Sequence, residues 1–171
     1  NNNTLLNIVN TDIVNGKAVK LRFRGAANSD DVFDISIFLS PGDMWTANVA
    51  ADGDLSRLVT SDTSCTLPSA ADIKDLGGKF KTNRVRNADP LQTREGYVEI
   101  LNMADVPPGT FANGANSPLY TAIKHVDGKA PCTQAVMDLQ ENDLVAVQDH
   151  VNSPLRRGYS WPTGGLMANW V

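Results

Sequence analysis

The strongest constraint on this chain is an alternation of apolar and polar side chains, repeated in short runs. The clearest run covers residues 18–24, where Val19, Leu21 and Phe23 alternate with three basic residues. A period of two is typical of a β-strand that buries one side and exposes the other. A chain built from such strands has to cover their apolar sides, and packing one sheet against another does this.

Turn residues separate the successive runs. Asn15-Gly16, Pro41-Gly42-Asp43 and residues 51–54 are turn sequences. Short strands broken in this way favour a mainly β fold, an antiparallel β-sandwich of jelly-roll or immunoglobulin-like type, over alternating strands and helices. The expected strands cover residues 4–10, 18–24, 33–39, 44–50, 55–60, 97–102, 155–161 and 165–171.

One or two short helices and long loops complete the expected fold. Residues 133–142 carry apolar side chains at helical spacing, and residues 70–76 are a second candidate helix. Residues 118–126 fit a helix and a strand equally well. The stretches 65–91 and 106–118 are rich in turn-forming residues and predict long loops.

Residues 1–171 are expected to form a single β-rich domain, because no linker, repeat or low-complexity segment divides them. The sequence begins Asn1-Asn2-Asn3 without Met, and its last expected strand runs to the final residue. These two ends fit a processed protein or a fragment of a longer chain.

The charge pattern and the hydropathy argue against two kinds of partner. The chain has 15 basic and 19 acidic residues, a net charge of −4, and its basic residues are scattered. Nucleic-acid binders need a basic patch to neutralise phosphates, so we expect no nucleic-acid partner. No run of about 18 apolar residues occurs, so we expect no transmembrane segment.

The two cysteines, Cys65 and Cys132, lie in turn-rich surroundings. A zinc site needs more ligands at closer spacing. A disulfide is therefore the favoured interpretation, and two free thiols are the alternative. A bond that closes a loop of this length stabilises a fold by about 4 kcal/mol in the chain-entropy model. Its presence would place the protein in an oxidising compartment, outside the cytoplasm.

The sequence lacks the usual catalytic motifs. The only histidines are His125 and His150, no Gly-x-Ser-x-Gly elbow occurs, and there is no His-Glu-x-x-His metal motif. Glycine pairs lack the spacing of phosphate-binding loops. We therefore expect a non-enzymatic protein without a cofactor, in which both histidines have structural or surface roles.

Acidic residues gather in two expected loops. Oxygen-rich loops of exported proteins can bind calcium weakly, but the EF-hand spacing is absent. Ordinary turn chemistry is the preferred interpretation, and calcium binding is the weaker alternative. The candidate ligands are Asp30, Asp31 and Asp34 in one loop, and Asp52 and Asp54 in the other.

Three aromatic residues, Tyr159, Trp161 and Trp170, fall close together in the sequence near its end. Exposed aromatic rings can stack on sugars, so these residues are candidates for a ligand-stacking platform. The preferred alternative is that they fill the core or an interface between proteins.

Several short sequence phrases occur in a characteristic order. The phrases are Val9-Asn-Thr-Asp12, Ala18-Val-Lys-Leu-Arg-Phe-Arg24, Phe33-Asp-Ile-Ser-Ile-Phe-Leu-Ser-Pro-Gly-Asp-Met-Trp-Thr-Ala47, Thr60-Ser-Asp-Thr-Ser-Cys65, Thr93-Arg-Glu-Gly-Tyr-Val-Glu99 and Pro162-Thr-Gly-Gly-Leu166. Together they resemble a family of exported proteobacterial proteins known only as hypothetical or cell-surface proteins, over residues 4–166. The resemblance implies export and a β-rich fold. It also implies that the chain is a fragment, because family members continue at both ends, and it brings no catalytic or ligand-binding residue.

These observations predict a non-catalytic structural or assembly protein of the bacterial cell surface or the extracellular space. A fibre subunit joined by strand exchange is one form of it, with self-association or another surface protein as the partner. The expected strands at residues 4–10 and 166–171 would each add to a neighbour's sheet edge. The alternative is a secreted module that binds a carbohydrate or another ligand.

Overall fold

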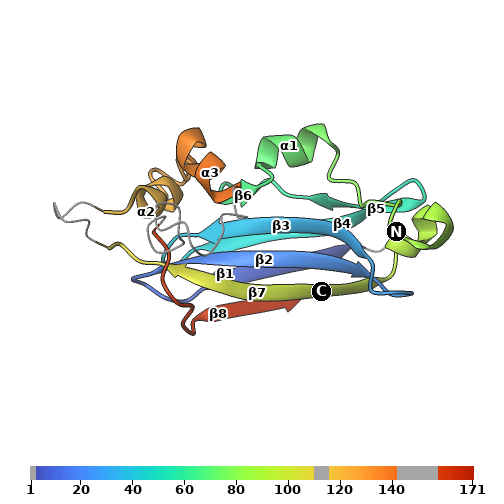
Figure 1. The fold of residues 1–171 in the computed structure, drawn as a ribbon, viewed down its shortest axis with the longest axis horizontal. Coiled ribbons are helices and arrows are strands. Elements are labelled where there is room, and N and C mark those ends of the chain that lie inside the picture. Colours follow the sequence, from blue (N-terminus) through green and yellow to red (C-terminus); the bar gives the residue numbers. More distant parts are fainter. Residues whose placement is uncertain (1–2, 110–115, 142–157) are drawn as a thin grey trace, which may run out of the picture.

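A computed structural model describes residues 3–109, 116–141 and 158–171. It is a β-sandwich of two antiparallel four-stranded sheets, as expected (Figure 1). Sheet A has the strand order β5-β4-β1-β8, and sheet B has the order β6-β3-β2-β7. The strands are β1 (Thr4–Asn10), β2 (Gly16–Gly25), β3 (Asp31–Leu39), β4 (Met44–Asp52), β5 (Leu55–Val59), β6 (Cys65–Leu67), β7 (Gly96–Val106) and β8 (Leu166–Trp170).

The alternating runs form strands close to where they are expected, although several strands are longer than the runs. The short strand β6 lies in a stretch where the sequence predicts a loop. Of the strand expected over residues 155–161, residues 155–157 lie outside the described residues. The described remainder contributes one β-bridge, between Ser160 and Asp105, instead of a strand.

Three α-helices are present among the described residues: α1 (Ala70–Asp75), α2 (Pro118–Ile123) and α3 (Gln134–Glu141). Two short 3-10 helices, Arg86–Ala88 and Pro90–Thr93, follow α1. The ambiguous segment 118–126 becomes helical because the Ser117 side chain caps its first turn, and Pro118 supplies the backbone angle that starts a helix.

The main core lies between the two sheets. It consists of the side chains that the alternation assigns to the buried side of each strand, such as Val19 and Leu21 of β2. Trp45 of β4 and Ile35 of β3 are completely buried against them. The period-two pattern therefore predicts which side of each central strand faces the interior.

A second apolar cluster lies on the outer side of sheet B, where α2 and α3 pack. The alternation of residues 33–39 groups Phe38 with polar Asp34 and Ser36, yet Phe38 is buried in this cluster. Sheet B is thus covered on both sides at this end. The sequence pattern shows that Phe38 points to the opposite side of β3 from Ile37 and Leu39. It does not show that helices cover that side.

A disulfide between Cys65 and Cys132 ties β6 to the segment that leads into α3, and their Cα atoms are 5.4 Å apart. The bond confirms the favoured interpretation of the two cysteines. It closes a loop of 67 residues, which stabilises the fold by about 4 kcal/mol in the chain-entropy model. It is compatible with export to an oxidising compartment.

Replacing Phe38 tests whether the helical layer is part of the cooperative fold. Phe38→Ala is expected to lower the free energy of unfolding by about 3–5 kcal/mol, because it leaves a cavity in the second cluster. Urea unfolding followed by circular dichroism measures the change. Ser36→Ala, on the same side of β3, is the matched control and should have a small effect. Equal effects of the two variants would contradict this role for Phe38.

Candidate functional site

Strand β8 forms one edge of sheet A and pairs with β1 only (Figure 1). The N–H and C=O groups of Val171 both bond to Leu5, at 3.0 and 2.8 Å. Because bonded pairs alternate in an antiparallel ladder, the backbone groups of three residues point away from β1. These residues are Leu166, Ala168 and Trp170.

Of the other three edges of the sandwich, two are covered or short, and the third, β7, is bridged at one end. Residues 78–80 run along β5 and bond to its backbone. β6 has three residues, and β7 carries Glu99 and is bridged at Asp105 by Ser160. No described residue pairs with the outer side of β8, and β8 has neither a charged residue nor a proline. Natural proteins obstruct strand edges to prevent unwanted pairing, so this open edge marks a candidate interaction site.

The outer face of sheet A next to this edge is uncharged and carries exposed methionines. Met167 of β8 and Met44 of β4 flank Val9 of β1 on opposite sides, with exposed fractions of 64% and 50%. The strands β1 and β8 contain no charged residue. Asn7 of β1 and Asn169 of β8 form the next pair on this face, and the Asn7 side chain donates a hydrogen bond to Asn169 Oδ1 at 2.9 Å.

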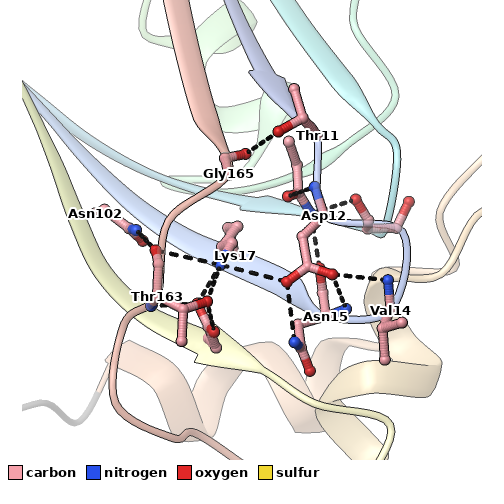
Figure 2. Close-up of polar contacts among 11 residues, drawn as sticks. Thr11, Asp12, Val14, Asn15, Lys17, Asn102, Thr163 and Gly165 are labelled. Carbon is pink, nitrogen blue, oxygen red and sulfur yellow. Dashed lines mark hydrogen bonds and ion pairs between the residues drawn. The ribbon is translucent and has the colours of Figure 1, made fainter.

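The segment that leads into β8 is anchored through Thr163, which contacts Lys17 of β2 (Figure 2). Its second partner is Asp105 of β7. The Thr163 hydroxyl accepts from Lys17 Nζ at 2.9 Å and donates to Asp105 Oδ2 at 2.5 Å. Two residues later, Gly165 O accepts from the Thr11 N–H at 2.7 Å. Gly165 has a φ of +94°, which favours glycine, because a Cβ is strained in this conformation.

Lys17 and Asp105 are buried charges. Their side chains have exposed fractions of 0% and 2%, and Lys17 Nζ lies 2.5 Å from Asp105 Oδ1. They are direct partners in the β2–β7 register. Lys17 lies on the same side of β2 as Val19, the side that faces the interior of the sandwich. Burying an ion pair costs free energy that only close partners offset, so the pair needs Thr163 in place.

Asp12 orders the turn between β1 and β2. Its Oδ1 accepts from the N–H groups of Val14 and Asn15, at 2.8 and 2.9 Å, and its Oδ2 accepts from the Asn15 side chain at 2.9 Å. The hydrogen bonds from Asn15 and Val14, with a smaller contribution from the nearby Lys17 charge, lower the pKa of Asp12 from 3.8 to about 2. Asp12 Oδ2 is 3.7 Å from Lys17 Nζ.

The structure does not gather the three candidate aromatic residues into one platform. Tyr159 packs against the second cluster. Trp161 has an exposed fraction of 86%, and Trp170 has one of 66%. Trp170 lines a groove of about 490 Å³ between the sheets together with Tyr97, whereas Tyr159 and Trp161 are not part of that groove.

Three of the five acidic candidates for calcium have basic partners. Arg22 lies 3.4 Å from Asp31 and 3.5 Å from Asp34, and Lys79 lies 3.4 Å from Asp52. Burial raises the pKa of Asp34, and a hydrogen bond with Asp31 adds to the effect. Asp30 and Asp54 complete the two predicted groups. Within residues 3–109, 116–141 and 158–171, no three His, Cys, Asp or Glu side chains are grouped to hold a metal ion.

His125 joins a polar cluster at the end of β3, whereas His150 lies outside the described residues. The Nδ1 atom of His125 is 3.1 Å from Ser40 Oγ and 3.4 Å from Asp43 Oδ2, so the hydroxyl and the carboxylate share one ring nitrogen. A nucleophile and its orienting carboxylate would need different nitrogens. Thr63 Oγ1 is 3.4 Å from Nε2, but this hydroxyl donates to a backbone carbonyl.

Comparison with protein-family models, curated proteins and solved structures gives no match for this chain. In the described part of the chain, no helix is long and apolar enough to span a membrane. The residues that anchor β8 were not singled out as a site in the sequence. Thr163 and Gly165 lie in the Pro162–Leu166 phrase that contributes to the family resemblance. That phrase was the sequence signal that could have drawn attention to them.

The turn at Asp12 predicts a pH dependence of stability. The folded chain lowers the pKa of Asp12, so ionised Asp12 stabilises the fold above about pH 4, and this contribution is lost as the pH falls through about 2. Asp12→Asn should therefore be less stable than the wild type near neutral pH, by a gap that closes in acid. Urea midpoints measured across this range test it. A gap of equal size at every pH would contradict the assignment.

Proposed function

We propose that this protein is a non-catalytic structural component of the bacterial cell surface or extracellular space, and that copies of it join by strand pairing at the edge of β8. A fibre subunit is one form of such a component. The disulfide Cys65–Cys132 supports export, because such bonds persist in oxidising compartments. The open and uncharged edge of β8 is the observation that carries the proposal.

The exposed edge of β8 is complementary to itself. In an antiparallel pair related by a two-fold axis at Ala168, Leu166 of one copy lies opposite Trp170 of the other. Such a joint closes as a dimer, so a fibre would need a second contact between dimers. Every outward backbone group of these three residues then finds a partner across the joint. Since β8 is uncharged, the two edges meet without like-charge repulsion, although the whole chain carries a net charge of −4.

The positions of the two terminal strands suggest which of them can form the joint. Both expected strands form, but they pair with each other, and β1 lies inside sheet A between β4 and β8. Of these two strands, β8 is the one with a free edge. Pairing at β8 needs no strand to leave its own sheet, so we propose edge pairing as the joint in place of exchange of β1.

Two methionines give a matched test of the joint. Met167→Lys puts a strongly hydrated charge on the edge strand and should weaken self-association by about tenfold or more. Met44→Lys makes the same change on the same face, two strands away, and should leave association unchanged. Light scattering of the full chain over a range of concentrations measures both variants.

Two results count against this joint. If the wild-type chain stays a monodisperse monomer at all concentrations, assembly through β8 is wrong. If Met44→Lys disrupts assembly as much as Met167→Lys, the outer face of sheet A is the interface and the edge is not.

A ligand-binding module is the second candidate, favoured by the groove between the sheets. Tyr97 and Trp170 lie at this groove. Two arginines and three hydroxyl residues add polar groups to its apolar lining: Arg24, Arg94, Thr4, Ser56 and Thr93. Its volume of about 490 Å³ is in the range of small-molecule sites. Aromatic rings beside polar groups suit a carbohydrate.

The groove predicts which tryptophan matters for a ligand. Trp170→Ala should abolish glycan binding on an array, because it removes a ring that lines the groove. Trp161→Ala removes the more exposed ring outside the groove and should leave binding intact. A wild-type chain that binds no glycan would remove this candidate, and equal losses in both variants would place the ligand elsewhere.

A further inference from the structure

We propose that Lys17 and Asp105 form a covalent cross-link, an amide bond between Lys17 Nζ and Asp105 Cγ, made by the folded chain itself with loss of one water molecule. The proposal goes beyond the assembly function and does not depend on it. It rests on the geometry of three side chains, those of Lys17, Asp105 and Thr163, and on their exclusion from water.

The two reacting groups are held together by the fold. Lys17 and Asp105 are opposite each other on the adjacent strands β2 and β7. Asp105 is fixed on its other side as well, because its backbone exchanges two hydrogen bonds with Ser160, at 2.9 and 3.1 Å. Lys17 Nζ lies 2.5 Å from Asp105 Oδ1. Such fixed proximity corresponds to an effective concentration of about 10⁵–10⁸ M for a well-aligned pair.

Burial favours the amide over the separated charges. The Lys17 side chain has no exposed surface, and Asp105 has an exposed fraction of 2%. A buried ammonium and a buried carboxylate both lose hydration, whereas an amide at the same place carries no charge. The released water leaves to bulk solvent, and a site that excludes water slows the reverse hydrolysis.

Thr163 supplies a path for the proton. Lys17 Nζ donates to Thr163 Oγ1 at 2.9 Å, and the same hydroxyl donates to Asp105 Oδ2 at 2.5 Å (Figure 2). The backbone N–H of Thr163 donates to Asp105 Oδ1 at 3.2 Å. The Thr163 hydroxyl thus links the attacking Nζ to the leaving oxygen Oδ2. The Thr163 N–H donates to Oδ1, the oxygen that becomes negative during the attack.

The reaction balances without a further reactant. A proton first passes from the Lys17 ammonium through the Thr163 hydroxyl to Asp105 Oδ2, which leaves a neutral amine and a neutral carboxyl group. Nζ then attacks Cγ, and the negative charge on Oδ1 is stabilised by the Thr163 N–H. A second proton follows the same path to Oδ2, the Cγ–Oδ2 bond breaks, and water leaves as the carbonyl at Oδ1 re-forms.

Asp12 supports the nitrogen during this sequence. Its Oδ2 lies 3.7 Å from Lys17 Nζ, on the turn that its own hydrogen bonds hold rigid. The neutral nitrogen gains a positive charge as its bond to Cγ forms, and a neighbouring carboxylate stabilises that charge. Asp12 keeps the same position after the amide has formed, because its hydrogen bonds with Val14 and Asn15 do not change.

Intact-mass spectrometry of the full chain, denatured and with its disulfide reduced, tests the cross-link. The wild-type mass is expected to be lower than the sequence mass by one water molecule, and tryptic digestion is expected to yield one branched peptide containing Lys17 and Asp105. Lys17→Met, which keeps an apolar chain of similar length, should show its full sequence mass. A wild-type chain of full sequence mass overturns the proposal.

A matched pair of variants tests the role of Thr163. Thr163→Val keeps the shape but removes the hydroxyl, and should slow cross-linking by about a hundredfold or more, so that freshly folded protein shows the full mass. Thr163→Ser restores the hydroxyl and should restore the lower mass. Rapid cross-linking in Thr163→Val would overturn the proton path.

Loss of water at another place has to be distinguished. Ring closure at Asp52-Gly53 or Asp127-Gly128 also removes one water molecule, but it leaves the Lys17 and Asp105 peptides separate. Separate peptides with a lowered mass would therefore overturn the cross-link. None of these outcomes alters the light-scattering test of β8, so the cross-link and the proposed assembly can fail independently.

Discussion

The buried contact between Lys17 and Asp105 is the interaction on which the arrangement around β8 depends. It joins β2 to β7 inside the sandwich, and it gives Thr163 two partners at once. Through Thr163 and Gly165, the same contact fixes where the last strand enters sheet A. Burying a charged pair costs free energy unless hydrogen-bonding partners surround it. The strand order at this corner supplies these partners, and the contacts of Lys17, Asp105 and Thr163 in turn hold the strands in this order.

Much of the fold follows from the period-two pattern, because one face of nearly every strand is buried in the main core. The same pattern fails where a third layer covers the outer face, as at Phe38. It also fails for β6, a three-residue strand too short to show a period. The disulfide was predictable from composition, but its location beside α3 depends on tertiary packing.

The candidate site was less accessible to sequence reasoning. Lys17 and Asp105 are 88 residues apart, and each looks like an ordinary surface charge at the end of a strand. Only the register of β2 with β7 places them side by side in the interior. The aromatic residues at the end of the sequence were a clearer signal, yet the fold distributes them over separate surfaces, since proximity in sequence does not fix which side of a strand a ring occupies.

The pairing of Leu5 with Val171 has a mechanical consequence. These residues come from the two ends of the described chain and face each other at one end of sheet A. Tension applied through both would peel β8 from β1 one hydrogen bond at a time, a mode of rupture that resists little force. The peeling front would travel along β8 until it reached Gly165 and Thr163. There the load would pass to Lys17 and Asp105, so the corner of the sandwich would act as the stop that limits how far the molecule extends.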